Sequence, residues 1–286
     1  MRSLYGVGWL TESPIIVVIN SLTLNTYIQK ENIMSKSNRR KVLDRRRAKK
    51  EKSGRIVKDK FNNEEQGTYI APKVYAKNPV QDKFLQALKN YQAVVYIASA
   101  GSGKSFLTMS TVADKLKSGN INKVILSRPA VGMGNSVGLL KGDLKDKYTP
   151  YLLPLIDVIK KRYGTGFYET CLSNGTIEML PLEYVRGRNI DEVLIVDEAQ
   201  NILPSEMFTI LTRVADGGQV IFLGDETQSD LRCKNALQWL PTYLGKHKDL
   251  LEYIHIVIGH SDSIERGGMC KALVKAREKD TGPMEG

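Results

Sequence analysis

A short apolar stretch that runs directly into a glycine-rich turn constrains this sequence more than any other feature. Residues 93–105 read AVVYIASAGSGKS, and residues 104–117 carry apolar side chains at helical spacing. A strand, a Gly-Lys-Ser turn and a helix, in that order, are typical of a phosphate-binding loop. The glycines let backbone N–H groups turn toward a phosphate, Lys104 can reach its outer oxygens, and Ser105 can offer its hydroxyl to Mg²⁺. This order of elements disfavours the alternative of a glycine-rich loop without a ligand.

The residues around this loop predict a nucleotide site. The loop opens with Ala98 where glycine is usual, and a small side chain there still permits the tight turn. Upstream, Gln81 lies in the segment NPVQDKFLQAL. Its amide can both donate and accept, which suits the edge of adenine, although the spacing alone also fits an ordinary surface glutamine. We assign nucleotide binding to Gln81, Ala98, Ser99, Ala100, Gly101, Ser102, Gly103, Lys104, Ser105 and Phe106.

Two further motifs predict the catalytic groups. Residues 192–200 read EVLIVDEAQ, which places Asp197 and Glu198 at the carboxyl end of an apolar strand. There Asp197 can hold Mg²⁺ and Glu198 can deprotonate a water, while a solvated strand end is the alternative. Another apolar run ends in GDETQ at 224–228, where Gln228 can sense a γ-phosphate. We expect these groups near the loop, because ligands of open α/β sheets bind at the carboxyl ends of the strands.

From residue 69 onward, short apolar runs alternate with amphipathic segments, which is typical of βαβ units. We predict strands at 93–98, 123–127, 193–196, 220–223 and 253–258, with an extra one at 176–180. We predict helices at 104–117, 144–162, 204–215, 235–244 and 263–279. The pattern favours one doubly wound α/β domain over 69–280, with a mainly parallel sheet and helices on both faces. An N-terminal extension at 1–68 and a tail at 281–286 flank it.

The formal net charge of +11 is concentrated in one segment. Residues 36–60 contain thirteen Lys or Arg and three acidic residues, and therefore carry a net charge of +10. Such a block cannot bury enough apolar surface to fold alone, and we expect the extension to be largely disordered. It resembles basic arms that neutralise nucleic-acid phosphates. A solubilising tail, or a contact with an acidic partner or membrane surface, are the alternatives.

Composition excludes several classes of protein. Hydrophobic residues make up 42% and charged residues 26%, as in globular proteins, and no apolar run reaches the roughly 18 residues of a membrane span. Glu12 interrupts the early apolar run, which argues against a signal peptide at 1–33. The three cysteines lack paired spacing, and the three histidines lack ligand spacing. We expect no zinc site and a cytoplasmic setting, in the host cytoplasm if the chain is viral.

The motifs together resemble the PhoH-like ATPases, whose core is similar to the first RecA-like domain of superfamily 1 helicases. The likeness is dense over 78–232 and thinner to 280, where an arginine–histidine pair is reduced to Arg266. It rests on Asn78, Gln81, the loop at 98–105, RPA at 128–130, LLKGDLK at 139–145, YLLPL at 151–155, PLEYVRGR at 181–188, DEAQ at 197–200, LTR at 211–213 and GDETQ at 224–228.

The resemblance implies a P-loop NTPase of RecA-like fold that uses ATP and Mg²⁺. It also implies a homo-oligomer, with a hexameric ring as one form. Some relatives carry a PIN ribonuclease domain ahead of the ATPase, but residues 1–70 lack the carboxylate cluster and the α/β pattern of such a nuclease. We therefore expect the ATPase module alone.

Arginines near the predicted strand ends could clamp a γ-phosphate in the same or a neighbouring subunit. We rank Arg213 first, because it ends the helix between the two strands that carry the acidic motifs. At least half of these arginines are expected to serve structure or to bind nucleic acid. The candidates are Arg128, Arg186, Arg188, Arg213 and Arg266.

These features predict an ATP hydrolase coupled to nucleic acid, with single-stranded RNA favoured. Its expected catalytic residues are Lys104, Glu198, Gln228 and Arg213. A small-molecule kinase would need a substrate lid and would not need DEAQ or GDETQ. The alternative from another class is an RNA-binding module that uses ATP binding as a switch without appreciable turnover.

Overall fold

A six-stranded parallel sheet forms the centre of the computed structural model, which describes residues 71–129 and 144–279. The strand order is β3-β2-β4-β5-β1-β6, and every pairing is parallel. The carboxyl ends of all six strands therefore lie at one edge. The strands are β1 (Ala93–Ala98), β2 (Val124–Ser127), β3 (Ile177–Met179), β4 (Val193–Val196), β5 (Gln219–Gly224) and β6 (Ile254–Gly259).

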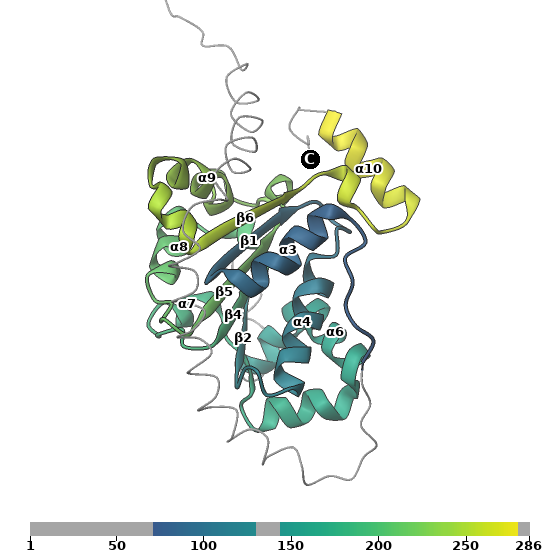
Figure 1. The fold of residues 1–286 in the computed structure, drawn as a ribbon, viewed down its shortest axis with the longest axis vertical. Helices are drawn as coiled ribbons and strands as arrows, with labels where there is room; N and C mark the ends of the chain where they lie inside the picture. Colours follow the sequence, from purple (N-terminus) through teal and green to yellow (C-terminus); the bar gives the residue numbers. More distant parts are fainter. Residues whose placement is uncertain (1–70, 130–143, 280–286) are drawn as a thin grey trace, which may run out of the picture. The chain divides into compact units, whose positions relative to one another are not determined.

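Helices cover both faces of the sheet, as predicted (Figure 1). Helices α3, α4 and α6 pack on one face, and α7, α8 and α9 on the other. The described helices are α3 (Pro79–Asn90), α4 (Lys104–Lys117), α6 (Leu144–Ser173), α7 (Leu182–Val185), α8 (Pro204–Leu211), α9 (Ala236–Lys246) and α10 (Gly268–Lys279).

The alternation of side chains along β1 explains why both faces must be covered. Val94 and Tyr96 lie in the core beneath α3, where Tyr96 meets Phe84 with 4.4 Å between ring centroids. Val95 and Ile97 point into the core under α9. All six residues of β1 are buried, as expected for a central parallel strand.

The structure confirms all of the predicted strands, including the extra one, and corrects several helix ends. Helix α6 continues beyond residue 162 to Ser173, with a kink at Gly164. Helix α8 ends at Leu211 rather than 215, because Ile190 bonds the carbonyl of Arg213 and the N–H of Ala215 in a short bridge. Helix α10 begins only at Gly268, after a 3₁₀ turn at 261–263. The prediction did not include α3.

Several sequence predictions lie outside the described residues. These are the extension at 1–68 with its basic segment at 36–60, the tail at 281–286, and most of the LLKGDLK motif. Within the described ranges, no helix is long and apolar enough to cross a membrane.

Candidate functional site

The glycine-rich turn joins β1 to α4 and leaves the start of the helix open to a ligand. Gly101 and Gly103 have left-handed backbones, with φ of 83° and 86°, which glycine adopts without strain. Gly103 is the N-cap of α4 and no side chain caps the helix there. The N–H groups of the first helical turn have no partner inside the helix, so they can bind an anion together with the positive end of the helix dipole.

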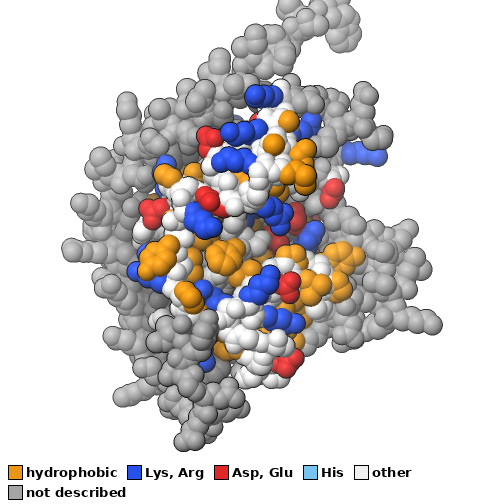
Figure 2. All heavy atoms as spheres, turned by 90° about the vertical axis from the view of Figure 1, so that its right-hand side faces the viewer, with side chains coloured by type: hydrophobic (Ala, Val, Ile, Leu, Met, Phe, Trp, Pro, Cys, Tyr) orange, Lys and Arg blue, Asp and Glu red, His pale blue; other side chains and the backbone are white. Residues whose placement is uncertain are grey.

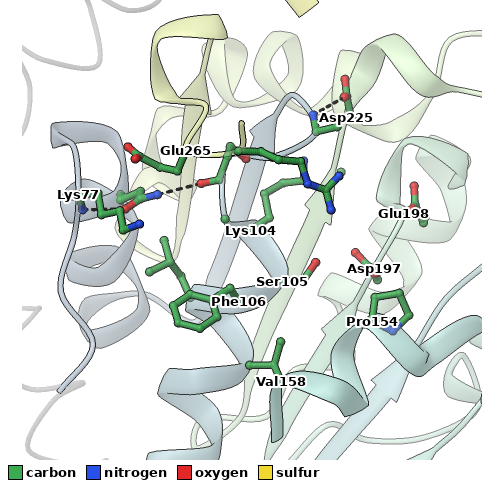
Figure 3. A pocket seen from close by; sticks show the side chains of 18 of the residues that line it. Lys77, Lys104, Ser105, Phe106, Pro154, Val158, Asp197, Glu198, Asp225 and Glu265 are labelled. Atoms are coloured by element: carbon green, nitrogen blue, oxygen red, sulfur yellow. Dashed lines mark hydrogen bonds between the residues drawn. The ribbon is translucent and has the colours of Figure 1, made fainter. Parts of the chain in front are cut away.

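Lys104 is the first residue of α4 and lies beside three carboxylates (Figure 3). Its ammonium donates to the carbonyl oxygens of Ala98 and Ser99, the latter at 3.1 Å. Burial lowers the pKa of Lys104, and the negative charges of Asp225, Asp197 and Glu198 oppose that shift. Lys104 thus faces three carboxylates, which partly offset the cost of burying its charge.

The acidic pair at the end of β4 faces the same cavity. Asp197 is 6% exposed, and burial together with the charge of Glu198 raises its pKa to about 6. Arg128 and Lys104 oppose this rise. Glu198 has a left-handed backbone, with φ of 55° and ψ of 42°, which is uncommon for a residue other than glycine. Its Oε1 lies 3.8 Å from Arg128 Nη2.

The tip of β5 connects the phosphate loop to the predicted sensor. Asp225 Oδ2 accepts from the N–H of Ala100 at 3.1 Å and from Nε2 of Gln228 at 2.9 Å. Asp225 Oδ1 accepts from both the N–H and the hydroxyl of Thr227. Gln228 therefore lies beside the loop, where sequence analysis expected it.

These groups line one cavity of about 760 Å³. Figure 3 shows Lys104 between the acidic side chains and a side formed by Lys77, Phe106 and Glu265. Phe106 is 56% exposed and lies near Val158 in this view. Sequence analysis did not assign the following lining residues to the nucleotide site: Tyr75, Lys77, Pro154, Val158 and Glu265. Tyr75 and Lys77 lie two positions apart in an exposed, basic stretch. This pattern is the only sequence feature that could have suggested these two residues as part of the site.

Gln81 is buried, so the alternative of an ordinary surface glutamine is wrong. Its side chain is 3% exposed and lines the cavity. Oε1 accepts from the N–H of Lys77 at 2.8 Å, and Nε2 donates to the carbonyl oxygen of Ser102 at 3.0 Å. The glutamine thereby fixes the loop in addition to any contact with a base.

The segment after β6 lies against the phosphate loop. The N–H of Glu265 donates to the carbonyl oxygen of Gly101 at 3.0 Å, and Asn78 donates to Glu265 Oε1 at 2.7 Å. A Cβ on Gly101 would approach Arg266 Cβ to 2.6 Å. This packing leaves no room for a side chain at Gly101 and brings Arg266 to the cavity wall.

The structure divides the candidate arginines into those that lie near the site and those that do not. Arg128 and Arg266 are near the site, whereas Arg186 pairs with Glu206 and Arg188 with Glu178. Arg213 is exposed and precedes β5, and its carbonyl oxygen accepts from the N–H of Ile190, which precedes β4. It therefore lies at the amino edge of the sheet, so its expected proximity to the phosphate site of its own subunit is wrong. A contact with a neighbouring subunit stays a prediction.

The residues at the cavity fit a magnesium–nucleotide complex. The uncapped start of α4 and Lys104 suit the charges of a triphosphate. The hydroxyl of Ser105 and the carboxylate of Asp197 both project into the cavity and are oxygen ligands of the kind that Mg²⁺ prefers (Figure 3). Two of the histidines are packing residues, since His255 stacks on Tyr91 and His247 lies on Tyr243. Fold and site together define a P-loop NTPase of RecA-like architecture.

The chain belongs to the PhoH-like protein family, whose model matches residues 73–278. The PhoH-like protein of Bacillus subtilis (strain 168) is 42% identical over 159 residues, which cover 55% of this chain and 50% of that protein. Protein PhoH of Escherichia coli (strain K12) is 35% identical over 206 residues, covering 71% and 58%. The large terminase of bacteriophage HK97 aligns with a TM-score of 0.44 and 11% identity, over 73% of this chain and 48% of that one. The chain thus spans about half the length of the curated relatives that it matches.

Proposed function

We propose that this PhoH-like protein hydrolyses ATP with Mg²⁺ and couples the reaction to nucleic acid, with single-stranded RNA as the favoured partner. The observation that carries the proposal is the position of Glu198 across one cavity from Lys104 and the open end of α4. A carboxylate there can activate water, and the lysine and helix end can neutralise phosphate charge.

In the proposed reaction, a water oxygen attacks the γ-phosphorus and its proton passes to the carboxylate of Glu198. The bond between the γ-phosphorus and the bridging oxygen breaks, and its electron pair stays on the β-phosphate of ADP. Lys104 holds the phosphate oxygens as their charge shifts. Ser105 and Asp197 would hold Mg²⁺, which supplies further neutralisation of the phosphates. Gln228, which follows the carboxyl end of β5, would sense the γ-phosphate.

The remaining cavity residues are suited to the nucleoside. Phe106 offers an exposed aromatic face beside the loop, on which a base can stack. Gln81 keeps one amide hydrogen that is not engaged with Ser102, so it can still contact the edge of adenine.

Nucleic-acid binding and assembly rest on two other features. The +10 charge of residues 36–60 can neutralise a phosphate backbone. The described residues form one RecA-like domain, and a homo-oligomer, with a hexameric ring as one form, would complete the site with a neighbour's arginine.

Steady-state ATPase rates with single-stranded RNA, with single-stranded DNA and without nucleic acid test this function. We expect basal turnover that rises with RNA and falls at least about 100-fold in the Glu198→Gln variant. Tight ATP binding without turnover in all three conditions would contradict hydrolysis and favour the alternative of an ATP-dependent RNA-binding switch. Equal rates in all three conditions would contradict the coupling alone.

A further inference from the structure

Gln200 is a buried residue that contacts the predicted base and the sensor segment at once. Its side chain is only 1% exposed. Nε2 donates to Glu198 Oε2 at 2.5 Å and lies 3.4 Å from the carbonyl oxygen of Gln228. Oε1 accepts from the backbone N–H of Asp225 at 3.1 Å. One amide group therefore joins the end of β4 to the end of β5.

The chemistry of these partners fixes the orientation of the amide. The backbone N–H of Asp225 can only donate, so the amide oxygen of Gln200 must face it. The NH₂ group must then face Glu198 and act as a donor. This arrangement engages Oε2 of Glu198 and leaves Oε1, which lies 3.8 Å from Arg128 Nη2, without a bond to Gln200.

Close packing holds the amide in place. A Cβ on Gly224 would lie 2.8 Å from Gln200 Oε1 and 3.1 Å from its backbone nitrogen. The hydroxyl of Ser229 donates to the carbonyl oxygen of Gln200 at 2.9 Å. A side chain at Gly224 would meet both Gln200 and Leu237, whose Cδ1 would lie 2.7 Å from the added Cβ.

We propose that Gln200 is a positioning residue for ATP hydrolysis, which anchors Glu198 as the general base and ties it to the tip of β5. This inference rests on the proposed function. Gln200 does not act on the substrate. It fixes one oxygen of Glu198, so that the other is presented to water in a single geometry, and a small misplacement of such a group lowers the rate steeply.

The test compares two buried glutamines changed in the same way. Gln200→Met keeps the bulk of the side chain and removes its hydrogen bonds. Gln219→Met is the matched control, because Gln219 is also buried and donates twice, to the carbonyl oxygens of Leu88 and Tyr91, at the other end of β5. We expect kcat to fall about 10- to 100-fold in Gln200→Met while KM for ATP changes less than about threefold, as for residues that orient a functional group. Gln219→Met should lose thermal stability but keep its kcat.

A double-mutant cycle separates positioning from general loosening of the site. Because Gln200 acts through Glu198, Gln200→Met should lower turnover no further in a Glu198→Gln background. The inference is overturned if kcat of Gln200→Met stays within about twofold of the wild type, if both methionine variants lose kcat equally, or if the two changes multiply. A wild-type protein without turnover would overturn the proposed function as well, whereas an active Gln200→Met variant beside an active wild type overturns only the inference.

Discussion

Glu198 follows β4 in a backbone conformation that is unfavourable for most residues that carry a side chain. Its left-handed φ of 55° costs about 1–2 kcal/mol relative to the usual region. The contact with Gln200 and the buried turn that follows offset this cost. In this conformation the side chain of Glu198 lines the cavity.

Replacing Glu198 by Gln should separate binding from turnover. The amide keeps the shape of the side chain and loses the ability to accept a proton, so turnover should fall at least about 100-fold while ATP affinity changes less than about threefold. ATPase assays and titration with a fluorescent ATP analogue measure both quantities. Lys104→Ala provides the opposite pattern, with lost affinity, because it removes the cation that faces the triphosphate. Near wild-type turnover in Glu198→Gln would remove Glu198 from its role.

At the scale of residues, sequence reasoning found the groups that lie in contiguous motifs. Residues 100–105 of the loop, Asp197, Glu198 and Gln228 line one cavity, because the ends of parallel strands meet at one edge. It missed the link between Gln200 and Asp225, since these residues are 25 positions apart and only the pairing of β4 with β5 brings them together. Arg213 was misplaced because a helix that joins two parallel strands returns the chain to the amino edge of the sheet, on the side away from the phosphate loop.

The elements were predictable where burial sets the pattern. Strands such as β1 and β4 are buried at every position, so their apolar runs stand out from the helices. The ends of helices were less predictable, because distant backbone groups decide them. The bridge between Ile190 and Val214 ends α8 before its apolar pattern stops.

That bridge makes Gly218 a sensitive position between α8 and β5. A Cβ on Gly218 would lie 2.0 Å from the carbonyl oxygen of Ile190. We expect Gly218→Ala to lower the free energy of unfolding by about 1–3 kcal/mol, because the backbone must shift to make room. Thermal denaturation measures the loss. Gly166→Ala is the control, since nothing lies within 4 Å of a Cβ there, and a loss of stability equal to that of Gly218→Ala would contradict the argument.

At the scale of the whole molecule, the exposed Arg213 suggests a test of assembly by complementation. If a neighbour's Arg213 completes each site, Arg213→Ala and Glu198→Gln should both be inactive alone, and their mixture should regain activity. In the mixed oligomer, the intact Glu198 of an Arg213→Ala subunit can face the intact Arg213 of a Glu198→Gln subunit. ATPase rates of mixtures, with the oligomeric state from light scattering, measure this. A strictly monomeric protein with full specific activity at every concentration would contradict it.

The basic segment allows a quantitative prediction for nucleic acid. Of its thirteen cations, roughly four to eight can contact phosphates, which gives a slope of log affinity against log salt of about −3 to −6 on single strands. Deleting residues 36–60 should flatten this slope and leave basal ATPase intact, because the site residues all lie beyond residue 74. Binding titrations at several salt concentrations measure the slope. An unchanged affinity and slope would make the segment a solubilising tail.

The order in which the chain is made imposes a constraint on when the site can exist. The phosphate loop is synthesised early, whereas β6 and Glu265, whose N–H bonds the carbonyl oxygen of Gly101 in the loop, are synthesised late. Asn78 and Glu265, which are hydrogen-bonded to each other, are 187 positions apart. A nascent chain on the ribosome therefore cannot complete the pocket until nearly all of the domain has emerged.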